Sequence, residues 1–220
     1  MTKKDVTTKI KALQEFIDLC SEATQETLKT ILVFWPRILA RLAVDGDRRV
    51  REKTASAHSQ FASKLGRNIA PQLKAMMGAW FTSQCDTYPP AALLASNSLK
   101  SCFPGSKLTD AVTFCHNEIV DYISDALMKE QDLNEEEKER MLVGGLAGYS
   151  LLLHQLDAST LEKEPFLSRH ADLWRVTSKL YSVVKKDCTM PVKQSWFAMV
   201  TCLVQVLPKL AQGNEILNYI

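Results

Sequence analysis

The side chains that could do chemistry in this chain are its four histidines and six cysteines. Two histidines spaced i, i+4 on a helix would suit a metal, but no pair has that spacing. The cysteines form no C-x-x-C pair, so the sequence lacks the usual zinc and thiol-disulfide motifs. We therefore expect no catalytic residue, no metal ligand and no cofactor among these side chains, which are His58, His116, His154, His170, Cys20, Cys85, Cys102, Cys115, Cys188 and Cys202.

Two further motifs favour structure over chemistry. The glycine run at 144–148 (GGLAG) lacks the preceding strand and the following Lys-Ser or Lys-Thr of a phosphate loop, so we interpret it as a close approach of helices. The acidic run at 135–139 lacks the glycine and the alternating oxygen ligands of a calcium loop. Asn134 precedes that run, which indicates a capped helix start at which the helix dipole favours the carboxylates.

Two basic clusters are the strongest candidates for binding. They could contact phosphate groups or an acidic protein surface, or they could be ordinary surface charge. No aromatic or glycine pattern of a single-strand RNA module accompanies them. The first cluster holds Lys3, Lys4, Lys9 and Lys11, and the second holds Arg37, Arg41, Arg48, Arg49, Arg51 and Lys53.

The elements that must position these residues are helical. Between Trp35 and Leu65, apolar residues recur at the three-and-four spacing of a buried helix face on both sides of Asp45-Gly46-Asp47. Glycine suits the helix end, and Asp47 can cap the next helix. This pattern resembles a HEAT repeat. The resemblance implies that Arg51 pairs with a turn aspartate of a neighbouring repeat.

A single hairpin cannot bury its apolar face, so the repeat predicts stacked neighbours. We expect an all-α, HEAT/ARM-like α-solenoid of antiparallel hairpins, with Phe61 and Trp80 in its core and the turn at 86–90 inside the repeats. Residues 1–220 are predicted to form one domain of a longer solenoid. Its expected hairpins are 7–44, 36–65, 69–103, 108–157 and 166–210.

Some expectations concern single helices. Thr7 or Thr8 is expected to cap the first helix. A second helix is expected to run over 25–44 with a bend at Pro36, and another over 108–129 with Phe114 on its buried stripe. Pro191 is expected near the start of the last helix.

Composition places the chain among ordinary globular proteins. It has 220 residues, 46% of them hydrophobic and 24% charged, and a net charge of +2, so bulk charge favours neither nucleic acid nor an acidic partner. No apolar run is long enough to span a bilayer, and no secretory signal follows Met1. Isolated cysteines indicate free buried thiols in a reducing compartment, the cytoplasm or nucleus.

Several segments in this order resemble the listerin family of RING-type E3 ubiquitin ligases. The resemblance covers about residues 3–130, and its segments are KKDVTTKIKALQEF, FWPRI, DRRVRE and APQLKAMMGAWFTSQCDTYPPA. It implies a cytosolic protein that ubiquitinates stalled nascent chains on the large ribosomal subunit. The chain has no RING cysteine pattern, so zinc, the E2 enzyme and ubiquitin transfer would belong to a RING domain elsewhere.

The resemblance implies that this region docks on the large subunit near the factor that tails nascent chains, and we expect a monomer. An alternative is a HEAT-repeat scaffold or transport adaptor that binds peptides along its concave face. For docking, the candidate residues are Lys3, Lys4, Thr7, Thr8, Lys9, Lys11, Arg48 and Arg49.

Overall fold

A computed structural model of the chain describes residues 5–128, 134–163 and 188–206. Every regular element in these ranges is a helix, and none of their residues is in a strand. The all-α prediction is therefore confirmed. The chain divides into two compact units, Met1–Ala111 (unit 1) and Val112–Ile220 (unit 2).

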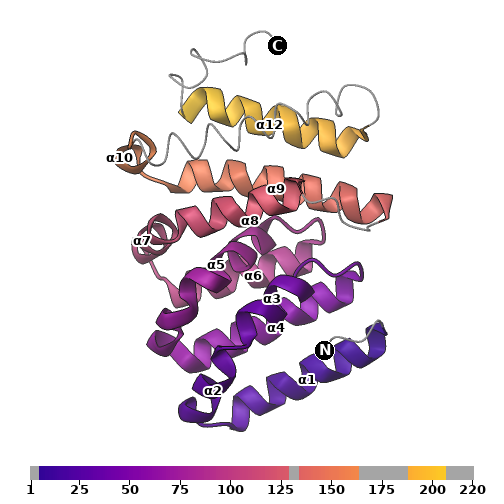
Figure 1. Ribbon diagram of the computed structural model, residues 1–220, viewed down its shortest axis with the longest axis vertical. Coiled ribbons are helices and arrows are strands. Elements are labelled where there is room, and N and C mark those ends of the chain that lie inside the picture. The colour runs from indigo at the N-terminus through magenta and orange to yellow at the C-terminus, as the bar shows by residue number, and fades with distance from the viewer. Residues whose placement is uncertain (1–4, 129–133, 164–187, 207–220) are drawn as a thin grey trace. The chain divides into compact units, whose positions relative to one another are not determined.

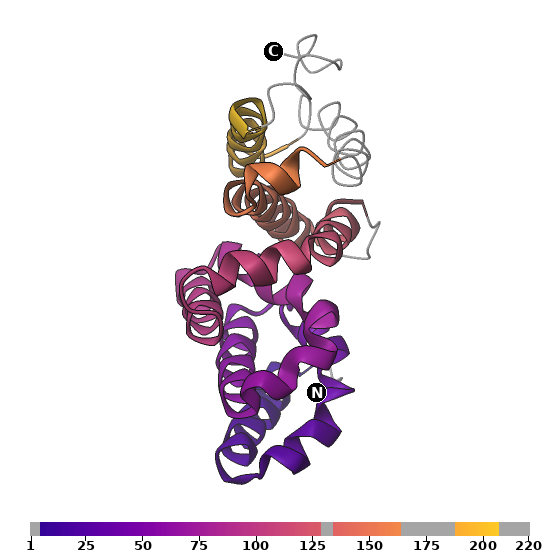
Figure 2. The ribbon, with the colours of Figure 1, turned by 90° about the vertical axis from the view of Figure 1, so that its left-hand side faces the viewer.

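Unit 1 consists of two rows of helices (Figures 1 and 2). In one row α4 (Arg48–Leu65) packs between α1 (Val6–Glu22) and α6 (Pro89–Cys102). In the other row α3 (Trp35–Leu42) packs between α2 (Gln25–Leu32) and α5 (Leu73–Thr82). Short 3-10 helices, η1 (Gly66–Gln72) and η2 (Ser83–Cys85), connect the rows, and α7 (Lys107–Phe114) follows across the division between units.

Aromatic side chains form the centre of unit 1. The Phe16 ring stacks on the Trp35 ring with centroids 4.4 Å apart, and Phe61 contacts both rings. His58 meets the Trp80 ring edge-on at 4.3 Å. Phe61 and Trp80 are fully buried, as the repeat register predicts.

The segment 25–44 is two helices, and the expected single bent helix is wrong. Proline cannot donate a backbone hydrogen bond, and its ring clashes with the carbonyl four residues earlier. The chain therefore turns before Pro36, where the Phe34 N–H donates to the Ile31 carbonyl at 2.9 Å. This turn leaves Val33 and Phe34 exposed.

Helix starts follow the local capping rules. The expected cap at Thr7 or Thr8 is wrong, because Asp5 caps α1 and its carboxylate accepts the Thr8 N–H at 2.6 Å. Asp47 caps α4 as predicted. The segment 86–90 lies inside unit 1 and is no boundary between units, but only residues 86–88 form the predicted turn, because Pro89 and Pro90 begin α6.

In unit 2, α9 (Glu135–Gln155) packs against both α8 (His116–Met128) and α12 (Met190–Val206), and a short α10 (Ala158–Leu161) follows α9. Asn134 and Glu137 form a capping box at the start of α9. A Cβ added to Gly145 would lie 3.0 Å from Leu127, so the glycine run does bring two helices close together. Pro191 lies in the first turn of α12, as predicted.

The expected helix over 108–129 is wrong, because the chain breaks at Cys115 between α7 and α8. There the Cys115 N–H bonds to the Val112 carbonyl, three residues earlier. The break rotates Phe114 outward, and its side chain is 62% exposed instead of buried. The first helix expected in the last hairpin, at about 170–184, lies outside the described residues.

Candidate functional site

Some of the N-terminal candidate side chains are exposed, and one is already held in a buried ion pair. Lys3 and Lys4 lie outside the described residues. Thr7 and Thr8 are exposed on the first turn of α1. Lys11 is also exposed, and its ammonium lies 3.9 Å from Glu15, a surface pair that contributes little to stability.

Lys9 is largely withdrawn from solvent into an ion pair, so it is a weaker docking candidate than the sequence suggests. Its Nζ lies 2.5 Å from Oδ2 of Asp45, and the two side chains are only 15% and 10% exposed. The pair joins α1 to the turn between α3 and α4. Lys9 precedes the buried Leu13 and Phe16 by four and seven residues, so helical spacing places it at the edge of the buried face.

Arg49 is exposed but already paired. Its guanidinium donates to both oxygens of Asp47, with Nη2 2.8 Å from Oδ2 and Nε 3.1 Å from Oδ1. The same carboxylate accepts the Arg49 N–H as the cap of α4. These hydrogen bonds lower the pKa of Asp47 to about 2. An incoming anion would have to displace this carboxylate, so Arg49 is a weaker candidate than the sequence suggests.

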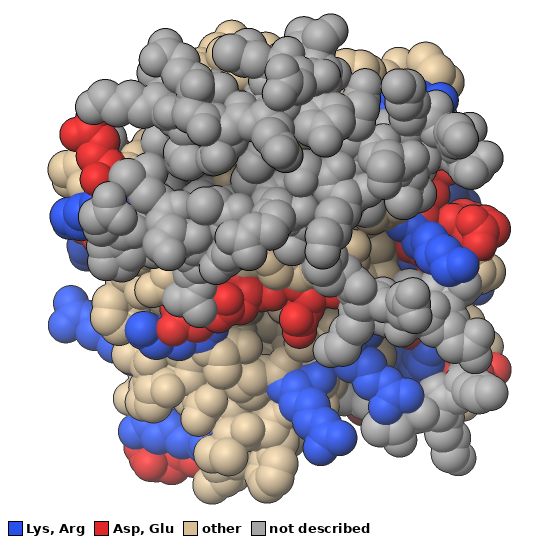
Figure 3. All heavy atoms as spheres, turned by 45° about the horizontal axis from the view of Figure 1, so that its top comes forward, with Lys and Arg blue, Asp and Glu red and all other residues tan. Residues whose placement is uncertain are grey.

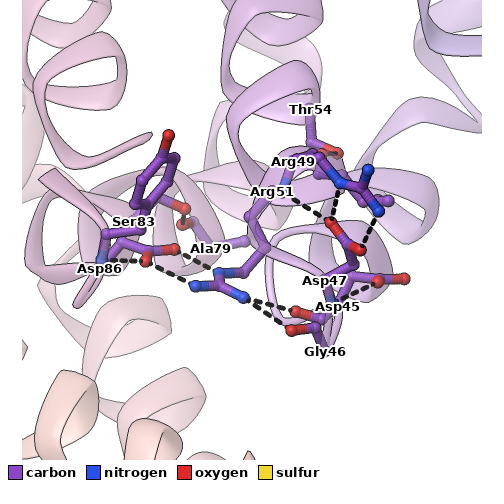
Figure 4. Close-up of polar contacts among 11 residues, drawn as sticks. Asp45, Gly46, Asp47, Arg49, Arg51, Thr54, Ala79, Ser83 and Asp86 are labelled. Carbon is purple, nitrogen blue, oxygen red and sulfur yellow. Dashed lines mark hydrogen bonds and ion pairs between the residues drawn. The ribbon is translucent and has the colours of Figure 1, made fainter. Parts of the chain in front are cut away.

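Arg51 is structural, as the repeat resemblance implies (Figure 4). Its Nε and Nη2 bond to Asp86 at 2.7 and 3.0 Å, and its Nη1 donates to the backbone carbonyls of Asp45 and Gly46. The Arg51 and Asp86 side chains are 4% and 7% exposed. The ion pair therefore joins the α3–α4 turn to the turn before α6.

Three arginines of the second basic cluster are exposed and have no carboxylate partner among the described residues, and we call Arg37, Arg41 and Arg48 the arginine surface. Arg37 and Arg41 lie one turn apart on the same face of α3. Arg48 begins α4, with its guanidinium 5.2 Å from the centroid of the Tyr88 ring. Arg41 and Arg48 therefore flank the α3–α4 turn. Lys53, the remaining member of the basic cluster, donates to the Gln14 side chain on α1.

Elsewhere, basic and acidic side chains are interspersed on the described part of the surface that Figure 3 presents. Single-sign fields attract oppositely charged partners over long distances. Mixed charge on this face agrees with the small net charge of the chain.

Cys202 and His154 are in contact in unit 2. Cys202 Sγ lies 3.0 Å from Nδ1 of His154, but burial raises the pKa of this thiol, whereas nucleophilic cysteines have a lowered one. No group of three or more His, Cys, Asp or Glu side chains is placed to hold a metal within the described ranges. His170 lies outside them.

None of the helices in the described ranges is both long enough and apolar enough to cross a membrane.

Comparison with known proteins identifies the family of this chain. Residues 1–219 match the family model described as "E3 ubiquitin-protein ligase listerin, N-terminal domain". The chain is similar to proteins named E3 ubiquitin-protein ligase listerin from Mus musculus (37% identity over 96% of the chain), Gallus gallus (36% over 97%) and Drosophila melanogaster (30% over 96%). It spans only 12%, 13% and 12% of the lengths of these relatives. The chain therefore belongs to the listerin N-terminal domain family.

Proposed function

We propose that this chain is a noncatalytic docking module of a listerin-type E3 ubiquitin ligase. In this proposal it binds the large ribosomal subunit in the cytosol, beside the factor that tails stalled nascent chains. A RING domain elsewhere in the ligase recruits the E2 enzyme and transfers ubiquitin. Membership of the listerin N-terminal domain family supports the ligase assignment. The observation that carries the docking role is the arginine surface, Arg37, Arg41 and Arg48.

Exposed arginines without an ion pair suit ribosomal RNA phosphate. The planar guanidinium can donate two parallel hydrogen bonds to a phosphate group, and it loses less hydration than an ammonium on binding. Arg49 and Arg51 already bond to carboxylates, so they have less to gain from a phosphate. We therefore assign the phosphate contacts to the arginine surface, with Lys11, Thr7 and Thr8 as further contacts on α1.

A small number of phosphate contacts suits binding to one specific site better than it suits general RNA binding. Each neutralised phosphate adds about 0.7–0.9 to the slope of log affinity against log salt concentration. Three arginine contacts therefore give a moderate slope, and the small net charge of the chain adds little non-specific attraction. Specificity then comes from the shape of the subunit face and from the neighbouring factor.

The experiment is co-sedimentation of the chain with purified large subunits and with intact ribosomes at several salt concentrations. We expect salt-sensitive binding to free large subunits alone, because docking requires the face that the small subunit covers. Arg41→Glu and Arg48→Glu should each weaken binding at least fivefold and flatten the salt dependence.

Lys100→Glu, which reverses an exposed charge on α6, is the matched control and should leave binding within twofold. Lys9→Glu is not a usable test, since it breaks the buried pair with Asp45. If Arg41→Glu and Arg48→Glu bind like Lys100→Glu, the arginine surface is not the docking site. If the chain binds neither free subunits nor subunits carrying the tailing factor, the docking proposal is wrong.

A further inference from the structure

A second surface of unit 1 has the features of a binding groove. It is a depression of about 690 Å3, within the volume range of ligand sites, between the C-terminal half of α4, η1 and the end of α6. We call it the serine groove, since Ser59, Ser63, Ser98 and Ser101 are among the residues that line it. None of the arginine-surface residues lines it, so the two surfaces are separate.

The charged residues that line the serine groove are all basic. Arg67 and Lys107 both line it and both are exposed. Neither makes an ion pair or a side-chain hydrogen bond with any described residue. No aspartate or glutamate is among the lining residues. Arg67 and Lys107 are therefore positioned to receive a carboxylate from outside the chain.

The floor of the serine groove is apolar. Ile69 and Leu73 line it with their side chains almost fully buried, and Phe103 lines it from the end of α6. The Phe103 ring already packs at a tilt against Trp80, with centroids 5.8 Å apart. Aliphatic side chains accept a small apolar group, whereas single-stranded RNA binds by stacking its bases on open aromatic faces. The floor therefore favours an apolar side chain over a nucleobase.

The polar walls suit a peptide backbone. Ser59, Ser63 and Ser101 have no side-chain hydrogen bond to a described residue, and Gln60 beside them also has none. Hydroxyl and amide groups can both donate and accept, which matches the alternating N–H and C=O groups of an extended peptide. Ser98 is different, because it accepts the Trp80 Nε1–H at 2.7 Å and donates to the Ala95 carbonyl.

We propose that the serine groove binds an extended acidic segment of a partner protein, with an apolar residue on Ile69 and Leu73 and flanking carboxylates at Arg67 and Lys107. Charge complementarity selects an acidic segment, and the aliphatic floor selects a peptide over RNA. The proposal does not depend on ribosome docking, because it uses different residues of unit 1.

Panning a random peptide library displayed on phage against the immobilised 220-residue chain tests this proposal. We expect enriched sequences with at least two Asp or Glu residues around one or two apolar residues. A fluorescein-labelled peptide of the enriched sequence should bind in a fluorescence anisotropy titration. Raising the salt concentration should weaken its binding.

Arg67→Glu and Lys107→Glu should each weaken that binding at least fivefold. Ser63→Trp should weaken it similarly by filling the groove without changing its charge. Lys100→Glu, a charge reversal on α6 outside the lining residues, should stay within twofold. Thermal melting identifies any variant that fails to fold, and the other two variants then decide.

Three results would overturn the proposal. The first is enrichment of no peptides, or of neutral or basic ones. The second is an acidic peptide that binds the groove variants as well as the parent chain. The third is a polyuridine RNA that competes equally and shows the same losses with the variants, which would make the groove a nucleic-acid site.

Discussion

Replacing Arg51 by Met tests whether the buried ion pair in unit 1 holds two turns together. The guanidinium makes two hydrogen bonds to Asp86 and one to each of the Asp45 and Gly46 carbonyls. Arg51→Met removes all four while keeping an unbranched side chain of similar length. The Asp86 carboxylate, 7% exposed, would retain only the Tyr88 N–H at 2.8 Å.

The expected loss in the free energy of unfolding follows from leaving the Asp86 charge buried without its partner. Removing one partner of a buried pair costs about 3–5 kcal/mol, because the remaining charge is poorly solvated. Asp86→Asn alone should cost less, since the amide oxygen can still accept from Arg51. The double variant Arg51→Met/Asp86→Asn has no uncompensated carboxylate. We therefore expect its loss to be smaller than the sum of the single losses by about 1–3 kcal/mol.

Hydrogen exchange with mass spectrometry can measure this effect in one unit. Peptides within 48–65 report the opening free energy of α4, and peptides within 135–155 in unit 2 serve as the internal reference. We expect protection to fall in α4 and to change little in α9. A loss below about 1 kcal/mol in α4, or additive single losses, would refute the assignment of Arg51 as a buried clamp.

Three further predictions concern buried groups of unit 1. Burial lowers the pKa of His58 from 6.5 to about 3, so its contribution to stability is complete above pH 6.5 and is lost towards pH 3, by about 1.4 kcal/mol per pH unit. The free energy of unfolding, measured with urea at several pH values in this range, should fall less steeply with falling pH for His58→Asn than for the parent chain. Asparagine keeps an acceptor for the Trp35 N–H. An equal pH dependence would contradict the buried neutral histidine. Lys9→Glu should lower the free energy of unfolding by on the order of 2 kcal/mol in urea, and Lys11→Glu by less than about 0.5 kcal/mol. Phe61→Ala should cost roughly 3–5 kcal/mol in the same assay, and melting within error of the parent would contradict its core position.

Helix capping and apolar spacing predict much of the α3–α4 hairpin from the sequence. The α3–α4 turn follows from Asp45-Gly46-Asp47, because the cap at Asp47 involves residues adjacent in the chain. The buried face of α4 follows from its spacing. Breaks inside longer apolar segments are harder to place. Residues 25–44 keep a helical period across Val33 and Phe34, and only the backbone restriction at Pro36 marks the turn.

The candidate site was predicted less well, because side-chain pairing depends on distant residues. Lys9 meets Asp45, which is 36 positions away, and nothing in the sequence of the first helix identifies that partner. Spacing relative to Leu13 could still have shown that Lys9 is not on the outer face. Arg67 lies in η1 and Lys107 begins α7, so the serine groove forms only once these separate segments come together.

The basic residues around the α3–α4 turn also show why a charge cluster overstates a binding surface. Lys9 bonds to the Asp45 carboxylate, Arg51 to the Asp45 and Gly46 carbonyls, and Arg49 to Asp47, so three cations stabilise one turn of three residues. That turn separates Arg41 from Arg48. The paired cations therefore fix the positions of the unpaired ones, and loss of the Arg51 clamp should weaken docking through Arg41 and Arg48 without any contact to the partner.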